Sequence, residues 1–265
     1  MSKEPRRNPY LVAKVVNMGE ENMLKSAVDF LGWSIHASDG EIGHVDDLYF
    51  DDETWTVRYA VVNCGNWLTG RRVLLSPGAL SGPADYIGRR FPVSLNRDQI
   101  KHSPDIDTHK PVSRQQEEEL FAYYSWPAYW PPLAVAGDES TVGLPGQLLK
   151  TTINKEDLHL RSLKVVKKYS IHATDGAIGH LTDFIVQEAT WKVRYLVVDA
   201  GRWLTGRRIL VAVAWMDHIS WLESTIFVAL TKQQVKNSPQ IGELMPNHSY
   251  EKELHEHYQK PGYWQ

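Results

Sequence analysis

Two histidines and two aspartates have the greatest potential for chemistry in this sequence, because they occur together twice with the same spacing. The two sets are His36, Asp39, His44 and Asp47, and His172, Asp175, His180 and Asp183. Imidazole and carboxylate groups are ligands for zinc and other transition metals. Alternatively, Asp39 stabilises a turn, Asp47 or His44 pairs across strands, and no metal binds. We favour this second interpretation, because neither set contains a cysteine or a third histidine, and we expect no cofactor.

A second repeated segment has the residue types of a binding surface. Gly65-Asn-Trp-Leu-Thr-Gly-Arg-Arg72 recurs as Gly201-Arg-Trp-Leu-Thr-Gly-Arg-Arg208. An indole beside two guanidinium groups can bind an anion, a carboxylate of a partner or a stacked base. The same residues also suit a hairpin tip whose Trp packs inward while the arginines are solvated. The candidate partner-binding residues are therefore Trp67, Leu68, Arg71, Arg72, Trp203, Leu204, Arg207 and Arg208.

Signatures of catalysis are missing from the sequence. Ser34 and His36 have the residue types of a nucleophile system, but we find no nucleophile elbow, phosphate-binding loop or zincin motif. The single cysteine, Cys64, corresponds to Ala200 in the second copy, which excludes thiol chemistry common to both copies. We expect that the protein is not an enzyme.

Composition and charge also limit the choice of partner and compartment. The chain of 265 residues is 42% hydrophobic and 23% charged, with a net charge of −3. Phosphate neutralisation requires a concentrated basic surface, so this charge disfavours a nucleic-acid partner. The sequence has neither an apolar run long enough to span a membrane nor an export leader. We therefore expect a cytoplasmic protein.

The elements that must position these residues are encoded twice. Residues 34–74 align without a gap on 170–210, with 25 of the 41 positions identical. A repeat this long indicates two globular copies rather than a solenoid. The predicted organisation is an N-terminal segment, a first repeat, a linker and a second repeat, at residues 1–23, 24–133, 134–159 and 160–265.

Each copy has the pattern of a small all-β unit. Turn signals recur about every 8 to 12 residues between stretches rich in β-branched and aromatic residues. The first predicted strand of the first copy ends near Ala37. The other four span residues 42–50, 54–62, 73–75 and 90–95. Asn96 and Thr231 each precede a Gln by three residues, which predicts a capping box at a short helix in each copy. A longer helix is expected over residues 114–124.

Strict alternation in the third strand places Trp55, Val57, Tyr59 and Val61 on one face. Arg58 and its counterpart Arg194 then lie on the opposite face, where the simplest partner is Asp47 or Asp183 on the neighbouring strand. The segments 124–130 and 258–264 keep Tyr, Pro, Tyr and Trp at the same spacing, so we expect both to fold back onto a hydrophobic surface.

The motif Asp-Gly-x-Ile-Gly-His-x-x-Asp, followed by a Trp-x-Val-Arg-Tyr-x-Val-Val strand, resembles the PRC-barrel family. That family includes the cytoplasmic domain of the photosynthetic reaction centre H protein and the C-terminal domain of the 16S ribosomal RNA maturation factor. The resemblance implies a small β-barrel without catalytic residues that acts in interaction and assembly. We therefore expect a mainly β fold of two tandem PRC-like barrels with short accessory helices, related by an internal pseudo-twofold axis.

The function that this resemblance implies is a non-enzymatic, cytoplasmic scaffold or adaptor for a protein partner. Two similar surfaces also allow a homo-oligomer. One alternative is a small-ligand or metal-binding protein that uses the repeated His and Asp set. Another is an RNA-associated assembly factor. Because the photosynthetic relative has a membrane-spanning N-terminus and the maturation factor has a separate RNA-contacting domain, we carry over only the module.

Overall fold

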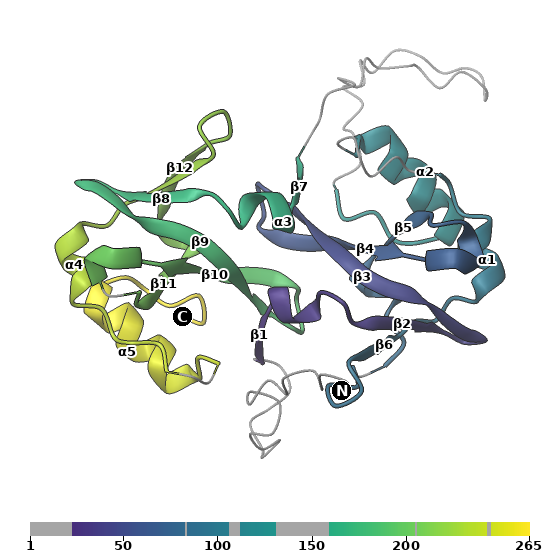
Figure 1. Ribbon diagram of the computed structural model, residues 1–265, viewed down its shortest axis with the longest axis horizontal. Coiled ribbons are helices and arrows are strands. Elements are labelled where there is room, and N and C mark those ends of the chain that lie inside the picture. The colour runs from purple at the N-terminus through teal and green to yellow at the C-terminus, as the bar shows by residue number, and fades with distance from the viewer. Residues whose placement is uncertain (1–22, 83, 106–111, 131–158, 205, 243–244) are drawn as a thin grey trace, which may run out of the picture.

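The computed structural model describes residues 23–82, 84–105, 112–130, 159–204, 206–242 and 245–265. Described residues up to 130 are called the first half below, and those from 159 onward the second half. Figure 1 shows the two halves side by side along the long axis of the molecule. The predicted N-terminal segment 1–23 and linker 134–159 lie outside the described residues, except for Met23 and His159.

The first half contains six strands and two α-helices that position its loops. The strands are β1 (Leu24–Ser26), β2 (Ser34–Ala37), β3 (Gly40–Asp51), β4 (Thr56–Asn63), β5 (Arg72–Leu75) and β6 (Arg90–Pro92), and the helices are α1 (Arg97–Lys101) and α2 (Arg114–Tyr124). Single 3-10 turns are η3 (Val28–Phe30), η4 (Gly65–Leu68) and η5 (Pro77–Ala79). The structure thus confirms the predicted helix 114–124, whereas the fifth predicted strand is shorter than expected.

The second half repeats most of this order and adds one strand. Its strands are β7 (Leu160–Ser162), β8 (Ser170–Ala173), β9 (Gly176–Gln187), β10 (Lys192–Asp199), β11 (Arg208–Ala212), β12 (Met216–Ser220) and β13 (Thr225–Val228). Its helices are α3 (Leu163–Val166), α4 (Lys232–Lys236), α5 (His248–Tyr258), η6 (Gly201–Leu204) and η7 (Val213–Trp215). Capping boxes are present at both predicted helix starts, Asn96 and Thr231.

All the described strands belong to one mainly antiparallel sheet. Its thirteen strands follow the order β12-β13-β8-β9-β10-β4-β3-β2-β6, with β1, β5, β7 and β11 paired off this path. The halves meet where Thr56 of β4 pairs with Lys192 of β10. Backbone hydrogen bonds from Val57 to Trp191 and from Val193 to Trp55 flank this pair. The sheet therefore runs through both halves and does not close into a barrel.

The second glycine of the sequence motif is required by a close backbone approach. Gly43 on β3 has a φ of 158°, and a Cβ there would lie 2.0 Å from the carbonyl oxygen of Asn63 on β4. Gly179 is in the same position against Asp199, also at 2.0 Å. Any side chain would collide with this neighbouring backbone, so Gly is the only residue that allows the two strands to pair here.

A bulge at Arg58 changes which residues of β4 share a face. Tyr59 pairs with Tyr49 of β3, but Val57 pairs with Phe50, so Arg58 has no opposite residue. The prediction of one continuous apolar face is therefore wrong, because an extra residue reverses the alternation. Val57 enters the large core that extends through both halves, whereas Tyr59 enters a second core beneath α2.

The first strand of each half pairs with a long strand of the other half. β1 pairs with β9, placing Lys25 opposite Val186, and β7 pairs with β3, placing Arg161 opposite Phe50. In Figure 1, β1 and β7 lie near the middle of the molecule, between the two sets of long strands. The two halves are consequently interlocked by backbone pairing rather than merely packed against one another.

Candidate functional site: the repeated loops and the contacts beneath them

The Trp side chain of each repeated loop is anchored to its own half of the chain. In η4, Nε1 of Trp67 donates a hydrogen bond to the carbonyl of Ile42. In η6, Nε1 of Trp203 donates to the carbonyl of Ile178 at 2.8 Å. Both indoles therefore pack inward, as in the hairpin-tip interpretation of the sequence, although Trp203 still exposes 36% of its surface.

Arg71 fastens the first loop to the end of α1. Its guanidinium donates to the carbonyl oxygens of Lys101 at 2.9 Å, Ser103 at 2.6 Å and Pro104 at 2.8 Å. It also pairs with Asp105 at 3.2 Å. Carbonyl groups at the C-terminal end of a helix have no partner within the helix and carry partial negative charge. Arg71 satisfies these groups, so it has a structural contact that the sequence did not indicate.

Arg207 makes the equivalent contact in the second half. It donates to the carbonyl of Lys236 at 3.0 Å and to the carbonyl of Ser238, beyond the end of α4. The two first arginines of the loops are therefore used inside the chain. Among the described loop residues, those exposed to solvent are Asn66, Thr69 and Gly70 in the first half and Arg202, Trp203, Gly206 and Arg208 in the second half.

The second arginines differ between the halves. Arg72 pairs with Asp46 at 3.1 Å and keeps 33% of its side chain exposed. Thr182 occupies the position of Asp46 in the second half, and Arg208 is exposed there. Leu68 and its equivalent Leu204 are partly buried against the large core.

The aspartates of the repeated His and Asp sets bind backbone and hydroxyl groups. Oδ1 of Asp39 accepts a hydrogen bond from the backbone N–H of Arg97 at 2.9 Å, and Oδ1 of Asp175 accepts one from Lys232 at 2.8 Å. These contacts fasten the turn before β3 or β9 to the first residue of α1 or α4. Asp39 therefore stabilises a turn, as the second interpretation predicts.

The other aspartate of each set accepts hydrogen bonds from the opposite half. Asp47 accepts from the Ser162 hydroxyl at 2.5 Å and from the backbone N–H of Lys164 at 3.1 Å. Asp183 accepts from the Ser26 hydroxyl at 2.5 Å and from the backbone N–H of Val28 at 3.0 Å. Each of these carboxylates thus binds the segment that begins the other half, which is β7 and α3 for Asp47 and β1 and η3 for Asp183. These two segments are called the exchanged segments below.

Burial raises the pKa of both of these carboxyl groups, because it removes water from the charged form. The pKa of Asp47 lies above its usual value, although its hydrogen bonds to Ser162 and Lys164 oppose the shift. The pKa of Asp183 is raised further, to about 6. Asp183 therefore responds to pH in a range where an ordinary aspartate does not.

The histidines of the sets make weaker contacts. Nε2 of His36 lies 3.2 Å from the hydroxyl of Ser34, and the ring of His172 lies 5.5 Å from that of Phe227. Within the described ranges, no three His, Cys, Asp or Glu side chains are grouped so that they could hold a metal ion.

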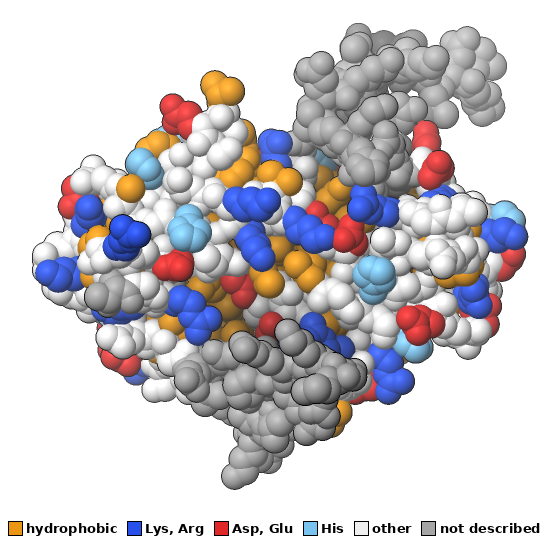
Figure 2. Space-filling model, viewed as in Figure 1, with side chains coloured by type: hydrophobic (Ala, Val, Ile, Leu, Met, Phe, Trp, Pro, Cys, Tyr) orange, Lys and Arg blue, Asp and Glu red, His pale blue; other side chains and the backbone are white. Residues whose placement is uncertain are grey.

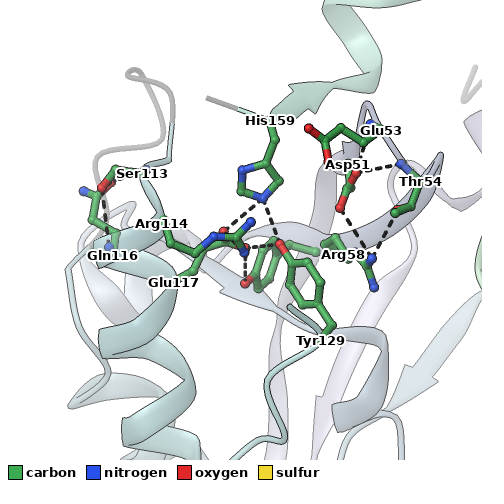
Figure 3. Close-up of polar contacts among 11 residues, drawn as sticks. Asp51, Glu53, Thr54, Arg58, Ser113, Arg114, Gln116, Glu117, Tyr129 and His159 are labelled. Carbon is green, nitrogen blue, oxygen red and sulfur yellow. Dashed lines mark hydrogen bonds and ion pairs between the residues drawn. The ribbon is translucent and has the colours of Figure 1, made fainter. Parts of the chain in front are cut away.

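Arg58 and Arg194 do not pair with the aspartates predicted for them. Nη2 of Arg58 lies 3.4 Å from Asp51, and its guanidinium stacks 3.7 Å from the centre of the Tyr129 ring (Figure 3). Arg194 donates to Gln187 instead. The prediction of an Asp47 or Asp183 partner is wrong, because those carboxylates are occupied by the exchanged segments.

A buried glutamate, Glu117, is the centre of a polar cluster that joins the first half to His159 of the second half (Figure 3). Glu117 on α2 is fully buried, and its Oε1 accepts hydrogen bonds from Tyr59 at 2.8 Å and Tyr129 at 2.6 Å. Its Oε2 lies 3.0 Å from Arg114 and 3.1 Å from His159. Burial and the Glu117 charge raise the pKa of both tyrosines. The glutamate is surrounded by donors and by positive charge.

The second half has a similar cluster around Glu251. Tyr195 and Tyr263 each donate to its Oε1 at 2.9 Å, and His255 lies 3.0 Å from the Tyr195 hydroxyl. His248 takes the place of Arg114, at 4.0 Å from Oε2 of Glu251. The histidines reach the two clusters from different places, because His159 precedes β7 whereas His255 lies within α5.

Residues 24–97 match the family model of the PRC-barrel domain. The first half contains a PRC-barrel domain. The match runs from β1 to the first residue of α1, and it does not confirm a second copy. No curated protein matches the chain. None of the described helices is long and apolar enough to cross a membrane.

The glutamate cluster joins α2 and the segment after it to the PRC-barrel domain, and the sequence reasoning missed it. A signal was present, because Glu117, Tyr59 and Tyr129 are identical to Glu251, Tyr195 and Tyr263 at equivalent positions. Among the described residues, the contacts of Glu117 join α2 to β4, to the segment after α2 and to the segment before β7. They dock α2 on the sheet.

The aromatic segments after α2 and α5 fold back, as the sequence predicts. Trp130 lies 4.8 Å from the Phe121 ring, and Arg114 lies 4.6 Å above the Trp130 ring. Trp264 lies 4.9 Å from the ring of His255. Each segment covers the helix that precedes it, and the first extends the hydrophobic core outside the PRC-barrel domain.

Proposed function

We propose that the protein is a non-enzymatic, cytoplasmic interaction module that acts as a scaffold or adaptor for a protein partner. The observation that carries this proposal is the reciprocal exchange of β1 and β7, which ties the two halves together through Asp183 and Asp47. Of the side chains that could otherwise do acid–base or metal chemistry, Asp47 and Asp183 are engaged in these contacts. A stiff body that holds two loops in fixed positions suits assembly, because little ordering entropy remains to be lost on binding.

In this proposal, the chain carries two PRC-type modules related by an internal pseudo-twofold axis. The recurrence of register supports this view: Ser34 lies opposite His44 between β2 and β3, and Ser170 lies opposite His180 between β8 and β9. Bulges recur at equivalent places as well, at Arg58 and Arg194. Such an arrangement presents the two loops as a pair, which suits a twofold partner or two copies of one partner.

The partner contacts the solvent-facing part of the two loops. The contact residues are Trp67, Leu68, Arg72, Trp203, Leu204 and Arg208, while Arg71 and Arg207 hold the loops in place. Trp and Arg are enriched among the residues that dominate binding energy at protein interfaces. Figure 2 shows basic and acidic side chains intermixed over the described part of the face in view, which fits a protein partner better than a nucleic acid.

A pulldown from the cytoplasm of the source organism tests the proposal. The bait is the full chain, compared with Arg72→Ala/Arg208→Ala in the loops. The matched control is Lys101→Ala/Lys236→Ala, which removes two exposed positive charges from equivalent positions of α1 and α4. Captured proteins are identified and quantified by mass spectrometry, and binding of the purified candidate is then measured by calorimetry.

We expect one protein to be captured by both the wild-type chain and the lysine control. The loop variant should capture at least about tenfold less of it, which corresponds to a loss of about 1.4 kcal/mol of binding free energy. Direct binding with the same ranking supports the proposal. Equal capture by all three baits contradicts the assignment of the loops. Turnover of a substrate by the purified chain contradicts the scaffold role itself.

A further inference from the structure

A cleft lies beside Arg58, where the first half meets the second. Its volume is about 420 Å³, within the range of about 300 to 1,000 Å³ that is typical of small-molecule sites. Its walls come from β4, from η5, from the segment after α2 and from the turn before β10; the residues used below are Arg58, Phe121, Trp126, Tyr129 and Trp191. The cleft is separate from the repeated loops and from the His and Asp sets.

Aromatic rings from both hydrophobic cores line this cleft. Trp126 stacks on Tyr124 at 4.4 Å and belongs to the core beneath α2. Trp191 packs against Phe30 at 5.5 Å in the large core that extends through both halves. Because their inner faces are held by other rings, both indoles are fixed in place before any ligand arrives. Pre-positioned aromatic walls favour a planar, ring-containing ligand.

Arg58 supplies the polar group of the cleft, and its hydrogen bonds are incomplete. Nη2 donates to Thr54 at 3.1 Å and lies 3.4 Å from Asp51. Nε is buried and has no hydrogen-bond partner among the described residues. The side chain of Arg58 keeps 18% of its surface exposed, and it is this exposed part of the residue, not the buried Nε, that can meet a ligand in the cleft. The guanidinium plane is held over the Tyr129 ring at 3.7 Å, which fixes its orientation.

The second half shares the stacked arginine, because Arg194 lies 3.9 Å from the centre of the Tyr263 ring, but it differs in two other features. Arg194 donates to Gln187 through both Nε and Nη2, so its Nε is satisfied. Lys260 stands at the position of Trp126, which removes one aromatic wall. The replacement of the Trp126 wall by Lys260 therefore predicts a single site in each chain, even though the two halves share so much sequence.

We propose that this cleft binds a small planar aromatic carboxylate. The ring lies against Trp126 and Trp191, and the carboxylate accepts hydrogen bonds from the Arg58 guanidinium. Arginine suits this role because its planar donors match a carboxylate. A cationic ligand is disfavoured, since the Arg58 charge repels it even though aromatic walls attract cations elsewhere. This inference goes beyond the scaffold role and does not depend on the repeated loops.

Calorimetry on the full chain with three matched probes tests the site. Indole-3-acetate carries the ring and the carboxylate, indole-3-acetamide has the ring without the charge, and tryptamine has the ring with a positive charge. We expect one indole-3-acetate per chain, with a dissociation constant at least about tenfold lower than that of the amide, because a charge-assisted hydrogen bond is about twice as strong as a neutral one. Tryptamine is expected to bind more weakly than the amide.

Two variants and one control assign the site. Arg58→Gln and Trp126→Lys, the latter introducing the residue type found at Lys260, are each expected to weaken indole-3-acetate binding at least about tenfold, or about 1.4 kcal/mol. Arg194→Gln is the control and leaves binding unchanged, with circular dichroism confirming that each variant is folded. The proposal is overturned by no saturable binding of indole-3-acetate, by equal affinity for the amide, by wild-type affinity in both variants, or by an equal loss in the control.

Discussion

The hydroxyl of Ser162 donates a hydrogen bond to Oδ2 of Asp47 at 2.5 Å, although 115 residues of sequence separate them. Ser26 and Asp183 make the same contact in the opposite direction, also at 2.5 Å. Together they fasten the leading strand of each half to the long strands of the other half. The free energy of folding of each half is thereby coupled to that of its neighbour, and we expect the chain to unfold in a single transition.

The contact between Asp47 and Ser162 should contribute measurably to stability. We expect Asp47→Ala to lower the free energy of unfolding by about 1 to 3 kcal/mol, because it leaves the Ser162 hydroxyl and the Lys164 backbone N–H without their acceptor. A double-mutant cycle with Ser162→Ala, followed by urea denaturation, should give a coupling energy of about 0.5 to 3 kcal/mol. Asp98→Ala, at a side chain that is 80% exposed, is the control. A coupling energy near zero would show that the two residues are independent.

Asp183 should make stability depend on pH in the mildly acidic range. Burial raises the pKa of its carboxyl group from 3.8 to about 6. The folded chain therefore binds this proton more tightly than the unfolded chain. The contribution of the Asp183 carboxyl group to the free energy of unfolding is fully present below pH 4 and is lost as the pH rises through about 6. We expect a loss of about 1 to 3 kcal/mol across this window, since one pKa unit corresponds to about 1.4 kcal/mol.

Urea denaturation of Asp183→Asn at several pH values checks this contribution. The amide does not titrate, so the free energy of unfolding should fall less between pH 4 and 6 in the variant than in the wild-type chain. Asp98→Asn should retain the wild-type slope. An unchanged slope in Asp183→Asn would show that another group titrates in this window.

Arg71 and Arg72 should differ in their effect on folding, although they are adjacent in the sequence. Arg71→Ala leaves three backbone carbonyls near the end of α1 without a donor. Because hydrogen bonds to charged groups contribute about 1.5 to 3 kcal/mol each, we expect a loss of about 2 to 4 kcal/mol. Arg72→Ala removes a partly exposed ion pair with Asp46 and should cost less than about 1 kcal/mol. Thermal and urea unfolding compare the two variants, and equal losses would contradict the structural role of Arg71.

The buried Glu117 should be among the most sensitive positions of the first half. Glu117→Ala leaves the hydroxyls of Tyr59 and Tyr129 without an acceptor and Arg114 without its counter-charge. We expect a loss of about 3 to 5 kcal/mol, as for other broken buried ion pairs. Glu256→Ala, in a surface pair with Lys252 at 4.0 Å, should cost less than about 0.5 kcal/mol. Similar midpoints for the two variants would mean that the Glu117 cluster does not hold α2 in place.

The purified protein should contain no stoichiometric metal, because the aspartates of the repeated sets are bound to backbone N–H and serine hydroxyl groups. Elemental analysis should find well below one zinc or iron per chain, and treatment with EDTA should leave the melting temperature unchanged. About one metal ion per half would overturn this interpretation. In that case, His36→Ala and His172→Ala would show whether the repeated histidines are ligands.

Several elements could be read from the sequence because their signals are local. Asn96 and Gln99 lie three residues apart, which is the spacing that a capping box needs, and the structure has that box. The helix 114–124 and the hairpin turn at Gly40 follow from the same kind of short-range rule. The aromatic spacing that ends at Trp130 likewise predicted a segment that folds back.

Tertiary structure alone decided which residues meet across the two halves. The three residues of β1 or β7 are too few to show a period, and their partners lie in the other half of the chain. The bulge at Arg58 could not be predicted from the sequence of β4 alone, because an extra residue is defined only by the strand opposite it. His159 and His255 reach equivalent glutamates from unrelated positions. Sequence spacing encodes contacts between residues a few positions apart, whereas contacts between distant segments depend on how the whole sheet packs.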